Sequence, residues 1–241
     1  MPAALSVCAV LASSAHAQAS AGETSATVAP LFSPDRLGAK GSLSLTLEFA
    51  DSRGGVPAPL SRSTVRLPAG VTLEVPRLRS CSASRLRARG IRGCPAASAI
   101  GHGQALVKAH DGSQTISENV SLWVFLGPLN NLQPSIEVFG QGYTPFDEQL
   151  ILTGTVLPAE GPYGEALALS IPPIPTLALE PDASIVTLSL VIGARVRGDA
   201  RDVNAVRLPS TCPPGGFPFA GEFTYADGSS GTSLSTAACP L

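Results

Sequence analysis

The chain has 241 residues, of which 44% are hydrophobic and 14% charged, and its formal net charge is -2 at pH 7. A chain of this length can bury a full core, as one large β-sandwich or as two small ones. The slight acidic excess argues against a nucleic-acid binder, because such proteins carry a basic excess over the whole domain. Trp123 is the only tryptophan, which argues against a sugar-binding surface built from several exposed tryptophans.

The N-terminus has the pattern of an export signal. An apolar run at 5–12 precedes Ala15-His16-Ala17, which matches the small-x-small motif that signal peptidase cleaves. We therefore predict a signal peptide at 1–17, with a buried N-terminal helix as the alternative. Residues 18–40 are rich in Ala, Ser and Thr and are expected to be a flexible lead-in to a single β-sandwich domain at 41–241.

The rest of the chain is typical of short strands joined by turns. Polar and apolar side chains alternate at 42–49, which predicts a half-buried strand. The proline-rich segment 171–176 cannot donate enough hydrogen bonds for a central strand. No segment keeps a period of 3.6 residues, so we expect little helix and an all-β, antiparallel sandwich, of which a jelly-roll is one form. Further strands are expected at 63–67, 71–75, around Leu106, and at 120–126, 136–139, 150–157, 166–171 and 185–196.

Four cysteines remain once the leader is removed, and they allow three pairings. Pairing between neighbours is the simplest and predicts two local disulfides, Cys81–Cys94 and Cys212–Cys239. Zinc sites favour cysteines two to four residues apart, which this chain lacks, so no metal site is expected. No later segment holds about 18 consecutive apolar residues, so we expect no transmembrane segment.

Each predicted disulfide encloses a recognisable unit. Between Cys81 and Cys94, Ser84 is a plausible cap and Gly90 a plausible stop for one helical turn. The segment 205–241 is a candidate sub-unit, a disulfide-closed hairpin with its turn at Ala226-Asp227-Gly228. Four aromatic residues of this hairpin share one parity and are expected on one strand face: Phe217, Phe219, Phe223 and Tyr225.

Two passages carry a resemblance. Residues 94–105 match C-P-x-x-S-x-I-G-x-G-x-A, and the cysteine-bracketed tail contains Phe223-Thr224-Tyr225-Ala226-Asp227-Gly228. Both passages resemble a group of uncharacterised secreted, β-rich proteins from high-GC Gram-positive bacteria. The resemblance implies export and a β-rich fold, and it implies no activity.

Charge divides the chain into two segments of opposite sign. Basic side chains dominate 36–108, whereas 109–194 contains no Lys or Arg and nine carboxylates. In one interpretation the segments pair across the fold, each exposed pair contributing about 0 to 1 kcal/mol. In a second, they mediate head-to-tail self-association. In a third, an exposed patch binds an anionic cell-wall polymer, an anionic lipid or an acidic protein. The candidate anion-binding residues are Arg77, Arg79, Arg85, Arg87, Arg89 and Arg92.

Catalytic patterns are weak. No G-x-S-x-G motif is present, and His102 and His110 are the only histidines after the leader. A glycosidase pair would have to come from the adjacent Asp147-Glu148 and the separate Glu160 and Glu165. We therefore expect no catalytic residue and no cofactor, and predict an exported, non-catalytic binding or structural module of the cell envelope or extracellular space. The alternative is a secreted hydrolase acting on polysaccharide.

Overall fold

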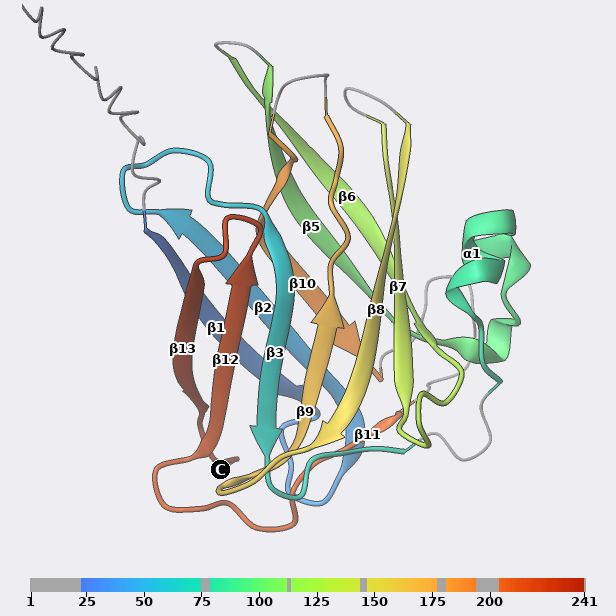
Figure 1. The fold of residues 1–241 in the computed structure, drawn as a ribbon. Coiled ribbons are helices and arrows are strands. Elements are labelled where there is room, and N and C mark those ends of the chain that lie inside the picture. The colour runs from blue at the N-terminus through green and yellow to red at the C-terminus, as the bar shows by residue number, and fades with distance from the viewer. Residues whose placement is uncertain are drawn as a thin grey trace, which may run out of the picture.

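The computed structural model describes residues 23–74, 79–111, 114–143, 147–176, 181–193 and 204–240. Within them, thirteen strands form one continuous antiparallel sheet, accompanied by the helix α1 (Ala83–Arg89) and two short 3-10 turns (Figure 1). The strands are β1 (Thr24–Ser33), β2 (Lys40–Asp51), β3 (Leu60–Pro68), β4 (Thr72–Leu73), β5 (Ala99–Asp111), β6 (Gln114–Leu126), β7 (Ser135–Gly142), β8 (Glu148–Pro158), β9 (Tyr163–Ser170), β10 (Ser184–Ile192), β11 (Val206–Arg207), β12 (Phe217–Tyr225) and β13 (Ser230–Ala237).

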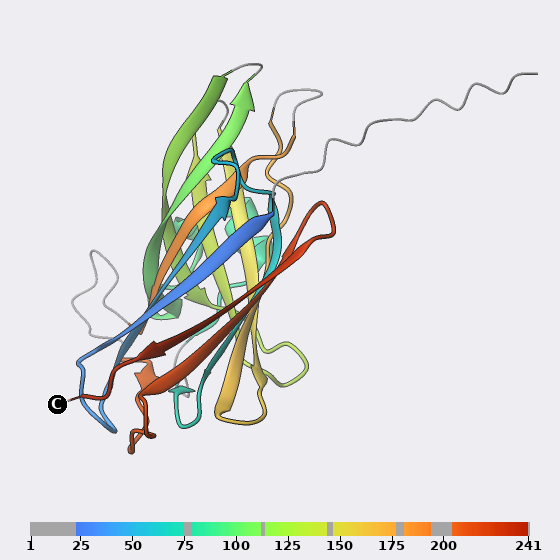
Figure 2. The same ribbon diagram turned by 90° about the vertical axis from the view of Figure 1, so that its left-hand side faces the viewer.

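The strand order shows how the sheet is built. Its hydrogen-bonded path runs β13-β12-β3-β9-β8-β7-β6-β5-β10-β2-β11-β4, and β1 pairs with β2 off this path. The sheet curls so that β1 lies beside β13, which Figure 2 shows from the side. The all-β class with little helix is confirmed. A sandwich of two separate sheets is not confirmed, because β12 joins β3 and β10 joins β5 to β2 in one sheet.

The main core lies inside the curl. Along β2, the predicted alternation is confirmed, because Leu43, Leu45, Leu47 and Phe49 are all buried. Phe49 packs edge to face on Phe223 of β12, with ring centroids 5.2 Å apart. Contacts of this kind join strands that lie far apart in the sheet order, so the curled sheet closes around a single apolar interior.

The predicted lead-in is wrong over the segment that forms β1. Thr24–Ser33 pairs with β2 along its whole length, from Thr24↔Asp51 to Ser33↔Ser42. Val28 and Phe32 reach the core from this strand, while exposed or half-buried side chains lie between them. Spaced four residues apart among Ala, Ser and Thr, these two residues give too weak an alternation to predict a strand. The domain therefore includes β1, and residues 18–22 lie outside the described residues.

Other predicted boundaries also shift. The strand expected at 71–75 is reduced to β4, and Val75 lies outside the described residues. Likewise β10 ends at Ile192, and 194–196 are not described. The C-terminal hairpin forms with its predicted turn, but β12 also pairs with β3, so the hairpin is part of the sheet and not a separate sub-unit.

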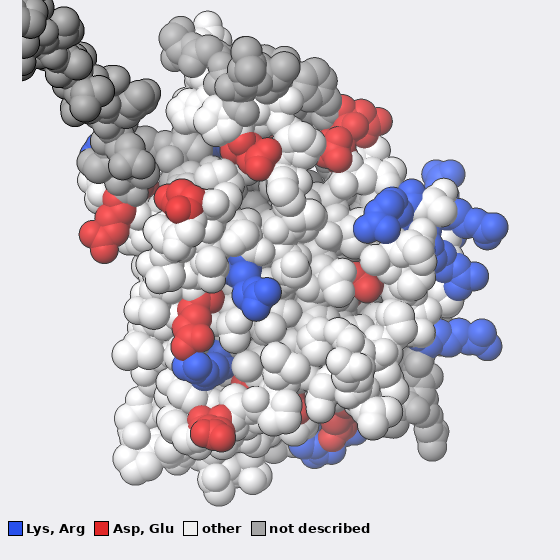
Figure 3. Space-filling view, in the orientation of Figure 1, with Lys and Arg blue, Asp and Glu red and all other residues white. Residues whose placement is uncertain are grey.

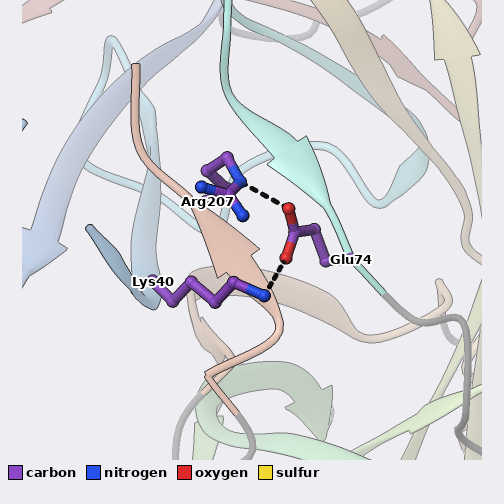
Figure 4. Close-up of polar contacts among 3 residues, drawn as sticks. All are labelled: Lys40, Glu74 and Arg207. Carbon is purple, nitrogen blue, oxygen red and sulfur yellow. Dashed lines mark hydrogen bonds and ion pairs between the residues drawn. The ribbon is translucent and has the colours of Figure 1, made fainter. Parts of the chain in front are cut away.

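An ion triad ties down the two shortest strands. Glu74, which follows β4, accepts a hydrogen bond from the Arg207 Nε on β11 and pairs with the Lys40 Nζ on β2 at 2.6 Å (Figure 4). The hydrogen bond from Arg207 and that from Lys40 lower the pKa of Glu74. Each of these two-residue strands makes few ladder hydrogen bonds, so the triad helps to hold β4 and β11 in register.

Candidate functional site

Both predicted disulfides are present, and the first closes a loop on the outside of the sheet. Cys81 and Cys94 are bridged, with their Cα atoms 5.4 Å apart. Between them lies α1, which is on the outside of the curled sheet (Figure 1). The Cys81 N–H donates to the Leu126 carbonyl at 2.8 Å, which fastens the beginning of the loop to the end of β6.

The local sequence explains why a helix of seven residues forms here. Ser82 is the N-cap, and its hydroxyl accepts a hydrogen bond from the Arg85 N–H at 3.3 Å. The prediction that Ser84 caps the helix is wrong, because Ser84 already lies within the first turn. Gly90 ends the helix as predicted, with φ at 58° and its N–H donating to the Leu86 carbonyl at 2.7 Å.

The underside of the loop has its own apolar cluster, separate from the main core. Leu86 is completely buried and packs with Cys81 against Phe125, Phe139 and Ile151 on the outer faces of β6, β7 and β8. An isolated helix of this length is unstable in water. The disulfide and this cluster therefore supply the stability that holds α1 in place.

A carboxylate lies buried beneath the loop. Glu137 on β7 is only 4% exposed and accepts a hydrogen bond from the Thr153 hydroxyl at 2.8 Å. Burial raises the pKa of Glu137, while hydrogen bonds from Thr153 and the Ala83 N–H, and the charge of Arg87, act in the opposite direction. Glu137 thus connects β7 to β8 and to the first residue of α1, which makes it a positioning residue for the loop.

The upper side of the loop is strongly basic. Arg79, Arg85, Arg87, Arg89 and Arg92 are exposed, and Figure 3 shows basic side chains gathered over α1. Arg77, the sixth predicted residue, lies outside the described residues. Three ion pairs in the described part of the chain join Lys40 and Arg207 to Glu74 and Arg66 to Glu222. None of these three pairs joins the basic segment to the acidic one, and none uses an arginine of the loop.

A groove of about 680 Å³ separates the loop from the outer face of β6, β7 and β8. One wall is the loop, including three of its arginines, and the floor is made of aromatic, amide and hydroxyl side chains. No Asp or Glu is among the described residues that line it. The lining consists of Arg87, Ala88, Arg89, Gly90, Ile91, Arg92, Asn119, Ser121, Trp123, Phe139, Gln141, Tyr143 and Gln149.

Pairing between strands explains why these floor residues meet. Side chains alternate between the two faces of a strand, so every second residue of β6 and β7 points outward. Trp123 is paired with Phe139, and Gln141 with Gln149. The Trp123 and Phe139 ring centroids are 6.2 Å apart. Neither this floor nor the buried Glu137 was predicted from the sequence. The available signal was the run of polar residues at alternate positions of 117–121.

The candidate catalytic residues are not brought together. His102 and His110 lie eight residues apart on β5, which separates them by about 26 Å. Glu148 begins β8, whereas Glu165 pairs with Pro158 at the other end of that strand. Glu160 is exposed in the turn between β8 and β9. The structure therefore assembles no glycosidase pair from these three glutamates.

Comparisons with known proteins add no family. No protein family, curated protein or solved structure matches the chain. In the described ranges, no helix is long and apolar enough to cross a membrane, and no three His, Cys, Asp or Glu side chains are grouped to hold a metal ion. The site is therefore interpreted from its own geometry, which combines guanidinium groups, amides and aromatic rings around one groove.

Proposed function

We propose that this protein is an exported, non-catalytic binding module of the cell envelope or extracellular space, and that it holds an anionic ligand at the arginine-bearing loop closed by Cys81–Cys94. The observation that carries this proposal is the groove beside α1, with three arginines in one wall and no carboxylate among its described lining. Guanidinium groups bind carboxylate and phosphate in a bidentate geometry.

The anchoring of the loop also supports binding. The arginines lie on a unit held by a disulfide, by the buried Leu86 and by Glu137, so the backbone that carries them is held in place before a ligand arrives. Preorganisation of this kind reduces the entropy lost on binding. Export is supported by the leader-like sequence at 1–17 and by two disulfides, since disulfides persist in oxidising compartments.

A retention experiment tests the proposal. Purified protein is passed over resin coupled to polygalacturonate or to polyphosphate, at low and at high salt. We expect retention at low salt that is lost at high salt, because the Debye length falls from about 30 Å at 0.01 M to about 3 Å at 1 M ionic strength.

Matched variants locate the binding site. Arg87→Gln with Arg89→Gln removes two charges from the groove and keeps helix-favouring side chains. Arg36→Gln with Arg62→Gln removes two exposed charges elsewhere on the surface. We expect the first pair to weaken binding about tenfold or more, since each hydrogen bond to a charged group contributes about 1.5–3 kcal/mol, and the second pair to have little effect. Equal losses in both pairs, or no retention on either resin, would overturn the proposal.

A further inference from the structure

The groove contains more than an anion site needs. Arginines alone would suffice for a simple polyanion, yet the floor adds two exposed or half-exposed aromatic rings and a set of amide and hydroxyl groups. Building on the proposed function, we infer that the ligand class is an acidic polysaccharide, a chain of pyranose rings that carry carboxylates, lying along the floor with its carboxylates facing α1.

The aromatic residues provide surfaces for sugar rings. Tyr143 is 67% exposed, and Trp123 is half-buried with its other side packed near Phe139. The C–H face of a pyranose is apolar, and it packs on the flat, electron-rich face of an aromatic ring. The chain's only tryptophan thus lies in this groove, although the composition had argued against a surface of several exposed tryptophans.

The amide groups suit sugar hydroxyls. Asn119, Ser121, Gln141 and Gln149 line the floor, and each offers a donor and an acceptor to the hydroxyls of a ring. The Gln141 Nε2 donates to Asp147 at 2.8 Å, and this hydrogen bond fixes the orientation of the Gln141 amide. A polymer without hydroxyl groups, such as polyphosphate, would leave these floor groups without a matched partner.

The dimensions favour a chain over a protein surface. From the Trp123 row to the Asn119 row the floor extends about 13 Å along β6, and from β6 to β8 it is about 10 Å wide. A volume of about 680 Å³ lies within the range of small-ligand sites. A standard protein interface buries about 800 Å² per partner over a broad surface. A concave groove of this size fits a short run of sugar rings.

The test separates ring recognition from charge recognition. Three probes are titrated into the protein: a galacturonate oligomer with rings and charge, its methyl ester with rings only, and a polyglutamate of equal charge without rings. Trp123 emission reports on this groove alone, because no other tryptophan is present. We expect the galacturonate oligomer to bind about tenfold or more tightly than either of the other two.

Variants of Tyr143 provide the site-specific evidence. Tyr143→Ala should weaken galacturonate binding about fivefold or more and leave polyglutamate binding unchanged, whereas Tyr143→Phe keeps the ring and should bind nearly normally. Tyr163→Ala, at the start of β9 and outside the groove lining, serves as the aromatic control. Thermal unfolding of each variant checks that the fold is intact.

The outcomes distinguish this inference from the proposed function. If polyglutamate binds as tightly as the galacturonate oligomer, and Tyr143→Ala affects neither, the polysaccharide assignment is wrong while anion binding stands. If the methyl ester binds as tightly as the acid, the arginines do not select the ligand and the acidic character is wrong. If none of the three probes binds, the polysaccharide assignment is wrong, and if the protein is also not retained on polyphosphate, the proposed function fails with it.

Discussion

The two disulfides of this protein hold regions with opposite roles. Cys212–Cys239 joins the residues that flank the hairpin of β12 and β13, and the aromatic side chains of β12 form part of the main core. Cys81–Cys94 closes a loop that adds nothing to that core and packs on the outer face of the sheet through its own small cluster. One region builds the interior, and the other builds a surface.

This difference shows how a rigid sheet can carry a separate binding element. Four aromatic side chains point inward from β12, so truncating any one of them should lower the stability of the whole fold. They are Phe217, Phe219, Phe223 and Tyr225. In the loop only Cys81 and Leu86 are fully buried, while the arginines remain in solvent. Substitution of the loop arginines should therefore leave the sheet intact, whereas substitution of the hairpin aromatic residues should destabilise it.

The largest effect is expected from truncating the hairpin core. Phe219 is fully buried, and its ring centroid lies 5.9 Å from that of Phe32. Phe219→Ala should therefore lower the free energy of unfolding by about 3–5 kcal/mol. Urea unfolding measures this change. The wild-type loop arginines are retained, so the folded fraction should still bind the anionic resin.

Leu86→Ala is the matched change in the loop. Leu86 is equally buried but lies in the separate cluster, so its loss should open the loop locally, with faster amide exchange in α1 than in β12. The proposed contrast between loop and hairpin is wrong if Leu86→Ala accelerates amide exchange equally in α1 and in β12. It is also wrong if Phe219→Ala leaves the free energy of unfolding unchanged.

The second prediction compares the disulfides directly. Replacing either cysteine pair by alanine should lower stability by about 3 kcal/mol in the chain-entropy model, given sequence separations of 13 and 27 residues. Thermal unfolding measures both losses. Binding should differ, because only the Cys81–Cys94 bridge positions the arginines of the groove.

We expect Cys81→Ala with Cys94→Ala to weaken retention on polygalacturonate about tenfold, and Cys212→Ala with Cys239→Ala to leave it close to wild type. Binding is measured at a temperature where both variants remain folded. If the hairpin variant loses as much binding as the loop variant, the division of roles between the two regions is wrong.

The smallest expected effect is a pH dependence at Glu137. Burial raises its pKa above the ordinary value of 4.5, so the folded state holds a proton that the unfolded state releases as pH rises. The contribution of protonated Glu137 to stability is full below pH 4.5, and it is lost as the pH rises through the pKa that Glu137 has in the folded state. Glu137→Gln removes this titration.

We therefore expect the stability of wild type relative to Glu137→Gln to fall as pH rises above 4.5 and then to level off. Urea unfolding across this pH range measures the difference. Glu148→Gln, which makes the same substitution at an exposed side chain at the start of β8, is the matched control. A difference between wild type and Glu137→Gln that is constant across the pH range would show that Glu137 has no raised pKa.

Local sequence patterns determined much of the fold. Alternation placed Leu43, Leu45, Leu47 and Phe49 on one face, and the parity of the β12 aromatics predicted their shared burial. Neighbouring cysteines predicted both bridges. These features depend on residues close together in the chain, so periodicity and turn chemistry are sufficient to predict them.

The candidate site is different, because only part of it is local. The arginines of the loop lie within one short segment, and the sequence identified them as candidate anion-binding residues. Trp123, Gln141 and Gln149 lie on three strands, and the burial of Glu137 depends on α1 packing over β7. Alternation shows that such residues share a face, but it cannot show which face turns to solvent or which residues lie opposite.

The sequence by itself therefore determined the all-β class, the two disulfides and the basic loop, since each depends on short-range patterns of polarity and spacing. The tertiary structure alone decided three things: that the strands form one curled sheet, that β1 belongs to it, and that the loop lies over the outer face of β6 to β8. Strand pairing between distant segments decides all three, and pairing depends on the packing of the whole core, which no single segment encodes.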